Sequence, residues 1–295
     1  MFEVFVPATS ANLGPGFDCL GLAIDLCLEV KAELSVEDHF YYRGAGQLDD
    51  KPGNLMHEGF RAAYHFLSKQ APRVSFFVNN PIPLARGLGS SSAALVAGIA
   101  LADAFLEGVL GRDGIFQLSA SLEGHPDNVA PAIFGGFTAS VYDGRTYLCE
   151  ALELPSDWQL LFGVPAFELL TSEARNVLPQ VYKRADVIYN TSRAALWSLA
   201  VIKNKPELLR LASQDKIHEP YREPLVPKLS ETKEKLLEAG AYAAFLSGAG
   251  PTLGVICSKE SVQSCHKLLT DFVGSGYVLQ TQASAGFRLN SLVQG

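Results

Sequence analysis

The sequence predicts an α+β protein with two domains, and three observations support this expectation. The chain has 295 residues, and a length of roughly 150 residues per domain points to two domains. Apolar residues make up 48% of the chain and charged residues 19%, which is enough apolar material for a sizeable core. Strand-like and helix-like stretches are mixed without strict βα alternation, which favours α+β over a doubly wound sheet. We place the boundary near residue 153, giving domains 1–153 and 154–295.

The first half begins with strand-like alternation at Phe2–Val6, and a loop rich in Gly, Pro, Asn and Ser follows at Pro7–Asp18. Apolar residues at helical spacing predict a helix over Asn54–Lys69, with Asn54 as its N-cap. The other expected elements of this half are strands at 20–34 and Val74–Val78, a buried Ala-rich helix at Ala93–Leu106, a helix end at Ser119–Gly124, and a turn into a strand at Phe134–Val141.

The second half changes from strand to helix and back. A strand is expected at Trp158–Pro165, and three helical stretches follow at Thr171–Leu178, Arg184–Lys203 and Leu225–Ala239. The remaining expected elements are a strand at Ala241–Ser247 leading into a Gly-rich turn, a strand at Thr252–Cys257, a helix at Ser261–Val273 and a strand at Gly276–Gln282.

Charge and cysteine content exclude several classes of protein. There are 24 Lys and Arg against 31 Asp and Glu, a net charge of −7, so binding to nucleic acid or to an anionic membrane surface is not expected. The five cysteines are widely spaced without a CxxC motif, which predicts reduced thiols rather than disulfides or a zinc site. With no signal peptide and no apolar run long enough to span a bilayer, we expect a soluble, cytoplasmic protein.

The most informative stretch is Gly87-Leu88-Gly89-Ser90-Ser91-Ser92, just before the buried helix. Glycines let the backbone approach a ligand closely, and the first amides of a helix are unpaired donors with partial positive charge. This combination is typical of a polyphosphate site. It is not a Walker A loop, because no Gly-Lys-Ser/Thr ends it, and it lacks the last Gly of GxSxG. The alternative is an ordinary turn capped by serines.

The segment Glu123–Asn128 places several chemically active groups together. A carboxylate such as Glu123 near nucleotide phosphates can hold Mg²⁺, although it can also be a solvated helix-end carboxylate. Asn128 can orient a ligand without carrying charge. We expect His125 to be structural rather than catalytic, because nothing nearby in the sequence clearly orients it.

Two further loops carry candidate groups. Asn12 and Asp18 lie on the turn-rich N-terminal loop and are suited either to gripping an ammonium or hydroxyl group or to capping their own backbone. The loop Ser247–Gly254 contains a GxG, but the spacing is GxGxxxG and a strand is expected to follow. A dinucleotide-binding fingerprint is therefore disfavoured. A glycine-rich loop that closes over a phosphate site fits better.

Together, the loops at 7–18, 81–94 and 246–254 resemble, in order, the three signature regions of the GHMP kinase superfamily. Within it, the stretches that resemble the homoserine kinase branch are 7–23, 125–136, 171–179 and 215–222. The resemblance implies an N-terminal domain like the second domain of ribosomal protein S5 and a ferredoxin-like C-terminal domain. It also implies phosphoryl transfer from MgATP to the side-chain hydroxyl of L-homoserine, a step towards threonine that yields O-phospho-L-homoserine and ADP.

The resemblance further implies roles for single residues. The amino acid would be held by Asn12, Asp18, Asn128, Arg175 and Arg222, with the arginines suited to its carboxylate. The residues implied in catalysis are Asp18, Asn128, Thr171 and Arg175, with Thr171 touching the γ-phosphate. Mg²⁺ would be held by Ser91 and Glu123, although Glu123 stands only two residues before His125, closer than in relatives with a longer linker. Nucleotide contacts are implied for Asn54, Leu55, Pro81, Ala85, Arg86, Gly87, Leu88, Gly89, Ser90, Ser91, Ser92, Gly248 and Gly250.

Two alternatives remain open at this point: a GHMP kinase acting on an isoprenoid alcohol or a sugar, and a nucleotide-binding protein without catalysis on the same scaffold. Because relatives are often dimers, a homodimer is possible. Asn128 stands where some relatives carry an Asp base. We therefore expect no dedicated strong base, with the hydroxyl proton passing to a phosphate oxygen or to water.

Overall fold

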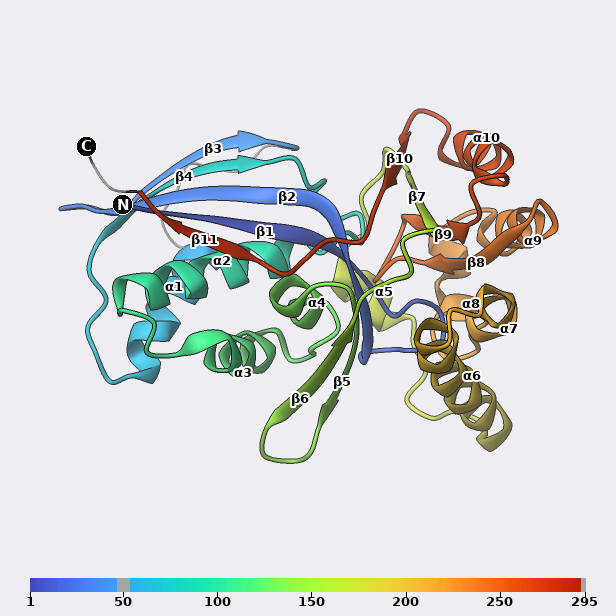
Figure 1. Ribbon diagram of the computed structural model, residues 1–295, viewed down its shortest axis with the longest axis horizontal. Helices are drawn as coiled ribbons and strands as arrows, with labels where there is room; N and C mark the ends of the chain where they lie inside the picture. The colour runs from blue at the N-terminus through green and yellow to red at the C-terminus, as the bar shows by residue number, and fades with distance from the viewer. Residues whose placement is uncertain (47–53, 293–295) are drawn as a thin grey trace.

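Two sheets organise the computed structural model, which describes residues 1–46 and 54–292 (Figure 1). The larger sheet has the order β11-β1-β2-β4-β3, with β5 pairing with β2 and β6 with β5. All its pairs are antiparallel except β3 with β4. Its strands are β1 (Phe2–Ala11), β2 (Leu20–Leu34), β3 (His39–Gly44), β4 (Val74–Asn80), β5 (Phe137–Tyr142), β6 (Tyr147–Leu152) and β11 (Arg288–Ser291).

Four helices cover one face of this sheet: α1 (Leu55–Phe66), α2 (Ser90–Phe105), α3 (Gly111–Glu123) and α4 (Val129–Phe134) (Figure 1). As predicted, Asn54 caps α1, because its side-chain oxygen accepts hydrogen bonds from the amides of Met56 and His57. The helices α1 and α2 can pack closely because Gly98 has no Cβ; a Cβ there would collide with the carbonyl oxygen of Met56. This close packing fixes the N-terminus of α2, where the glycine-serine loop ends.

The second sheet is antiparallel with the order β10-β7-β9-β8. Its strands are β7 (Gln159–Val164), β8 (Ala241–Leu246), β9 (Leu253–Cys257) and β10 (Tyr277–Thr281). The order along the chain, with helices between β7 and β8 and one helix between β9 and β10, gives the predicted ferredoxin-like arrangement. The helices of this half are α5 (Thr171–Asn176), α6 (Arg184–Ile202), α7 (Leu209–Ala212), α8 (Glu219–Arg222), α9 (Leu229–Glu238) and α10 (Val262–Val273), with the 3₁₀ turns η1 (Pro206–Leu208) and η2 (Glu223–Leu225).

The structure corrects two details of the sequence analysis. The residues expected to open a loop at Pro7 continue β1 as far as Ala11. Pro7 is accommodated at a register shift between Pro7 and Ala8, beyond the stretch where β11 pairs with β1, so its missing amide interrupts no ladder on that side. The helix expected from Leu225 begins only at Leu229, after η2.

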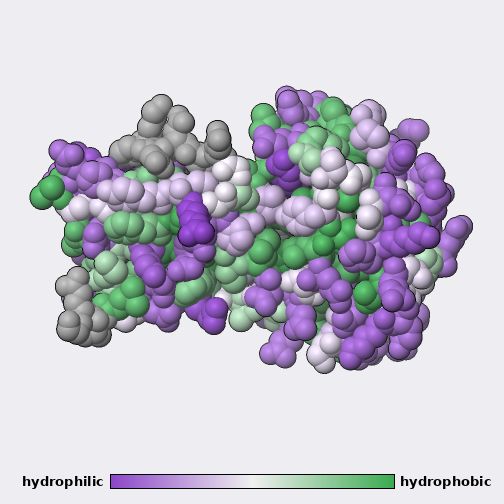
Figure 2. Space-filling model, turned by 90° about the horizontal axis from the view of Figure 1, so that it is seen from above, coloured by the Kyte–Doolittle hydropathy of each residue, from purple (hydrophilic) through white to green (hydrophobic). Residues whose placement is uncertain are grey.

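The last described strand, β11, belongs to the larger sheet, because it pairs with residues Phe2–Phe5 of β1. The predicted boundary near residue 153 falls between β6 and β7, which belong to different sheets; the boundary itself stays a prediction. In the space-filling view a notch separates two lobes, and hydrophilic residues cover much of their outer rim (Figure 2). None of the helices in the described part of the chain has the length and apolarity that crossing a membrane requires.

Candidate active site

The predicted site residues gather around one cavity of about 580 Å³. Its walls come from the N-terminal loop, the glycine-serine loop, the α3–α4 connection, α5, α8 and the loop after β8. The cavity is lined by the predicted residues Asn12, Asp18, Asn54, Leu55, Ala85, Arg86, Gly87, Leu88, Gly89, Ser90, Ser91, Ser92, Glu123, Asn128, Thr171, Arg175, Arg222 and Gly248. Pro81 and Gly250 are not among the lining residues.

The glycine-serine loop brings the N-terminus of α2 to the cavity. Gly89 is the N-cap with φ 69° and makes no side-chain cap, so the first amides of the helix are left to bind a ligand. The serines are used differently. Asn80 donates to Ser90 Oγ at 3.1 Å, and Ser92 Oγ donates to Glu123 Oε1 at 2.8 Å, whereas Ser91 is exposed. Ser91 is thus the serine of the loop that stays accessible.

A second glycine-rich loop packs backbone to backbone on the first. Ser247 Oγ donates to the carbonyl oxygen of Gly87 at 2.6 Å and lies 2.7 Å from Ser10 Oγ. A Cβ on Gly87, where φ is +72°, would lie 2.9 Å from the carbonyl oxygen of Gly250 and closer still to that of Ser247. The approach is therefore open only to glycine at position 87.

Arg86 is committed to the protein backbone. Its guanidinium donates to the carbonyl oxygens of Leu84, Pro165 and Ala166 at 2.6, 3.1 and 2.6 Å. It therefore ties the loop to the end of β7. Nearby, the amide of Leu169 donates to the carbonyl oxygen of Ala85 at 2.9 Å, which strengthens the same connection.

At the other end of the cavity, Asp18 and Arg175 form a two-pronged ion pair. Arg175 Nη2 lies 2.6 Å from Asp18 Oδ1 and Nη1 lies 3.1 Å from Oδ2, across 157 residues of sequence. Asn12, with φ 70°, accepts a hydrogen bond from the amide of Asp18 and donates one to the carbonyl oxygen of Gly248, each at 3.0 Å. Asn12 thus holds the turn that presents Asp18.

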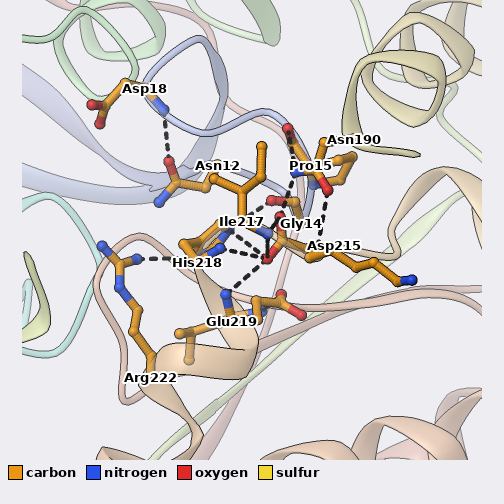
Figure 3. A network of polar contacts seen from close by, with 12 residues as sticks. Asn12, Gly14, Pro15, Asp18, Asn190, Asp215, Ile217, His218, Glu219 and Arg222 are labelled. Carbon is orange, nitrogen blue, oxygen red and sulfur yellow. Dashed lines mark hydrogen bonds and ion pairs between the residues drawn. The ribbon is translucent and has the colours of Figure 1, made fainter. Parts of the chain in front are cut away.

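Arg222 is fixed in place by three hydrogen bonds, of which Figure 3 shows the one to His218. Nε donates to the carbonyl oxygen of Ala174 at 3.1 Å, and Nη1 donates to the carbonyl oxygen of Gly248 at 2.9 Å and to His218 Nδ1 at 3.1 Å. Burial and the nearby Arg175 charge lower the pKa of Arg222 to about 10. Two guanidinium groups near one another at a cavity wall favour binding of an anion there.

The structure corrects the reason given for interpreting His125 as structural, because an orienting group does lie two residues away. The structural role itself stays a prediction. His125 Nδ1 lies 2.7 Å from Asp127 Oδ1, and Asp127 is buried. Burial alone would lower the pKa of His125, but the hydrogen bond and negative charge of Asp127 raise it above its ordinary value. Both residues line the cavity. The sequence analysis did not identify Asp127 as the partner of His125, although it lies within the segment Glu123–Asn128.

Glu123 is suited to a divalent cation. Burial raises the pKa of its carboxyl group, and the hydrogen bond from Ser92 only partly opposes this rise. A half-buried carboxylate beside serine hydroxyls at a helix N-terminus fits Mg²⁺, which takes one or two carboxylates and completes its shell with phosphate oxygens and water. In the described part of the chain, ligand atoms of Asp18, His125 and Asp127 also lie within 4.8 Å of one another. Because Asp18 is already paired with Arg175, this group is less suited to a cation.

The apolar end of the cavity contains residues that the sequence analysis did not single out. Phe40 and Tyr42 come from β3, Val78 from β4 and Met56 from α1. Asn54, predicted for the nucleotide, lies at the same end. Such a partly apolar pocket beside a phosphate loop is suited to a flat heteroaromatic ring.

Comparison with known proteins agrees with this geometry. The family described as GHMP kinases N terminal domain matches residues 56–136, and the one described as GHMP kinases C terminal matches residues 198–267. A homoserine kinase of Thermus thermophilus is 51% identical over 254 residues, which cover 86% of each chain. Another, from Desulfitobacterium hafniense, is 40% identical over 274 residues, covering 92% of each chain.

A crystal structure of homoserine kinase from Cytophaga hutchinsonii superposes with a TM-score of 0.86 at 26% identity, covering 98% of this chain and 97% of the other. Mevalonate kinase of L. major shares the fold, with a TM-score of 0.70 at 14% identity and coverage of 96% of each chain. The chain therefore belongs to the GHMP kinase family and, within it, to the homoserine kinases. The family and the two-domain fold predicted from the three loops are both confirmed.

Proposed function

We propose that this protein transfers the γ-phosphoryl group of MgATP to the side-chain hydroxyl of L-homoserine, giving O-phospho-L-homoserine and ADP. The observation that carries the proposal is the pairing, in one cavity, of an uncapped helix N-terminus at one end with two arginines at the other. The first suits the polyphosphate of ATP, and the second suits the carboxylate of an amino acid. The homoserine kinases among its relatives support the same assignment.

In this proposal the phosphates lie on the amides of residues 87–92, with Ser91 facing them. The adenine ring occupies the apolar end formed by Phe40, Tyr42 and Val78, next to Asn54 and Leu55. Thr171, exposed at the first turn of α5, reaches the γ-phosphate from the opposite wall. Arg86 lines the cavity, whereas Pro81 and Gly250 do not, and the nucleotide contacts predicted for these three residues stay predictions.

The amino acid lies between Asp18, Asn128 and the two arginines. Asp18 faces its ammonium group, and Arg222 together with Arg175 faces its carboxylate. Thr9 Oγ1 donates to Asn128 Oδ1 at 2.8 Å, and Asn128 Nδ2 donates one hydrogen to Asp127 Oδ1 at 3.4 Å. The second amide hydrogen of Asn128 is left to orient the ligand. The role of these residues is positional, because a loose phosphoryl transition state is favoured chiefly by alignment and charge neutralisation.

Mg²⁺, held by Glu123 and Ser91, would supply charge neutralisation at the phosphates. We infer that no residue in the described part of the chain acts as a strong base at the hydroxyl. Both oxygens of Asp18 are occupied by the ion pair with Arg175, so its role in this proposal is to orient the substrate. The hydroxyl proton passes to a phosphate oxygen or to water.

The test is an ADP-release assay with homoserine, serine, threonine and mevalonate as acceptors. We expect activity with homoserine to exceed that with each of the others. Full activity on mevalonate, which has no ammonium group, would overturn the assignment in favour of an isoprenoid kinase. Nucleotide binding without ADP release on any acceptor would indicate a protein that binds but does not catalyse. The reaction fits an enzyme of the cytoplasm, where ATP is available.

A further inference from the structure

We propose that His218 is a positioning residue for amino-acid recognition, holding Arg222 so that its remaining donors face the substrate carboxylate. The inference rests on the proposed function, since it concerns the carboxylate of the same substrate. Its basis is the hydrogen-bond network around His218, which is fully buried on the segment leading into α8 (Figure 3). No motif in the sequence analysis assigned His218 a role.

The two ring nitrogens of His218 have different partners. Nε2 lies 2.6 Å from the carbonyl oxygen of Gly14, which can only accept, so Nε2 carries the hydrogen. Nδ1 lies 3.1 Å from Arg222 Nη1, which can only donate, so Nδ1 is the acceptor. Burial lowers the pKa of His218 and keeps the ring neutral, which this arrangement requires. The ring thus links the N-terminal loop, through Gly14, to Arg222.

The backbone around His218 is itself fixed. The carboxylate of Asp215 accepts hydrogen bonds from the amides of Ile217, His218 and Glu219 at 2.8 to 3.1 Å. It also accepts one from Asn190 Nδ2 at 2.6 Å. The imidazole therefore has little freedom to follow Arg222, and it is Arg222 that adopts the orientation set by the histidine.

A count of donors shows what this orientation achieves. A guanidinium has five N–H groups. One on Nε goes to Ala174, and the two on Nη1 go to His218 and Gly248. Nη2 makes no hydrogen bond to any residue in the described part of the chain, and Arg222 lines the cavity. The two N–H groups of Nη2 are therefore left for a ligand with paired oxygens, such as a carboxylate.

Matched substitutions separate the two contacts of the ring. The Oδ1 of asparagine is as many bonds from the backbone as Nδ1 of histidine, so His218→Asn keeps an acceptor for Arg222. The Nε2 of glutamine corresponds to Nε2 of histidine, so His218→Gln keeps only the donor to Gly14. His218→Leu removes both. Thermal melting of all three variants shows which of them fold.

The assay compares L-homoserine with 3-aminopropan-1-ol, which has the same hydroxyl and amino groups but lacks the carboxylate. The second compound is tested as a substrate or, where its turnover is too slow to measure, as a competitor of homoserine. We expect His218→Gln and His218→Leu to raise KM for homoserine about tenfold, the effect of one charged hydrogen bond. We expect three quantities to stay within about twofold of native: kcat, KM for ATP, and the KM or inhibition constant for 3-aminopropan-1-ol. A twofold difference lies within the error of such comparisons. His218→Asn should lie close to native for every ligand.

Three outcomes overturn the inference. The first is an equal loss with both ligands, which would make the role of His218 structural. The second is the reverse pattern, in which Gln is close to native and Asn is impaired, because the contact with Gly14 would then be the one that matters. The third is a native protein that does not phosphorylate homoserine, and this outcome alone also overturns the proposed function.

Discussion

Replacing Gly87 with alanine tests whether the contact between the two glycine-rich loops sets the geometry of the phosphate site. The new Cβ would lie 2.9 Å from the carbonyl oxygen of Gly250 and nearer to that of Ser247. Real Cβ atoms essentially never lie closer than 3.0 Å to such an atom. Because both obstacles are backbone atoms, the loops must separate by on the order of 1 Å. A misplacement of about that size costs roughly 10²-fold in rate. We therefore expect kcat/KM for ATP to fall about 100-fold.

The matched control is Gly108→Ala. Gly87 and Gly108 have φ +72° and +78°, but nothing lies within 4 Å of a Cβ at Gly108. Both substitutions should cost about 1–2 kcal/mol in unfolding free energy from the left-handed backbone alone. Only Gly87→Ala should lose activity, as measured by ADP release at varied ATP with homoserine saturating. If the two variants had equal kcat/KM, the reasoning about the loop contact would be refuted.

Three further substitutions test single parts of the site. Asn54→Ala removes the cap of α1 and should cost about 1 kcal/mol in a urea unfolding experiment. Asp18→Asn breaks a charge-assisted pair with Arg175 and should raise KM for homoserine by tenfold or more, about 1.4 kcal/mol. A large fall in kcat with unchanged homoserine binding would instead identify Asp18 as a base. Glu123→Gln should increase the Mg²⁺ concentration needed for half-maximal activity and should raise Tm of the ligand-free protein at neutral pH.

The rise in Tm expected for Glu123→Gln should depend on pH in a definite direction. Burial raises the pKa of Glu123 above its ordinary 4.5, so the folded state holds this proton more tightly than the unfolded chain does. Below pH 4.5 the carboxyl group is protonated in both states, and its full contribution to stability is present. As the pH rises through the folded-state pKa, that contribution is lost. The Tm advantage of Glu123→Gln should therefore grow with pH, and an advantage independent of pH would contradict burial as the cause.

The loops could be predicted from the sequence because their chemistry is contiguous. Residues 87–92 combine glycines, serines and a helix start within six positions, and the structure brings them to the cavity. The N-cap at Asn54 was predictable for the same reason, since a cap depends on neighbouring amides alone. Features that depend on the path of the backbone were harder. Pro7 was interpreted as opening a loop, but a bulge lets β1 continue past it.

Contacts between distant segments could not be predicted from local patterns. The pair formed by Asp18 and Arg175 spans 157 residues, and Arg175 was identified only through resemblance to a family. The apolar end of the cavity also depends on β3, which was not predicted although its aromatic residues 40–42 favour a strand. Even Asp127 was missed as the partner of His125, because two residues in a turn face each other only in particular backbone conformations.

The distribution of charge in the cavity predicts that its two ends will respond to different substitutions. The described residues that line it include no lysine, and their arginines are Arg86, Arg175 and Arg222. Arg86 is bound to backbone carbonyls, and the other two flank Phe17, each 5.4 Å from its ring centre, at the amino-acid end. The phosphate end therefore depends on backbone amides, whose positions respond to glycine substitutions. The amino-acid end depends on side chains, whose orientation is set by neighbours such as His218.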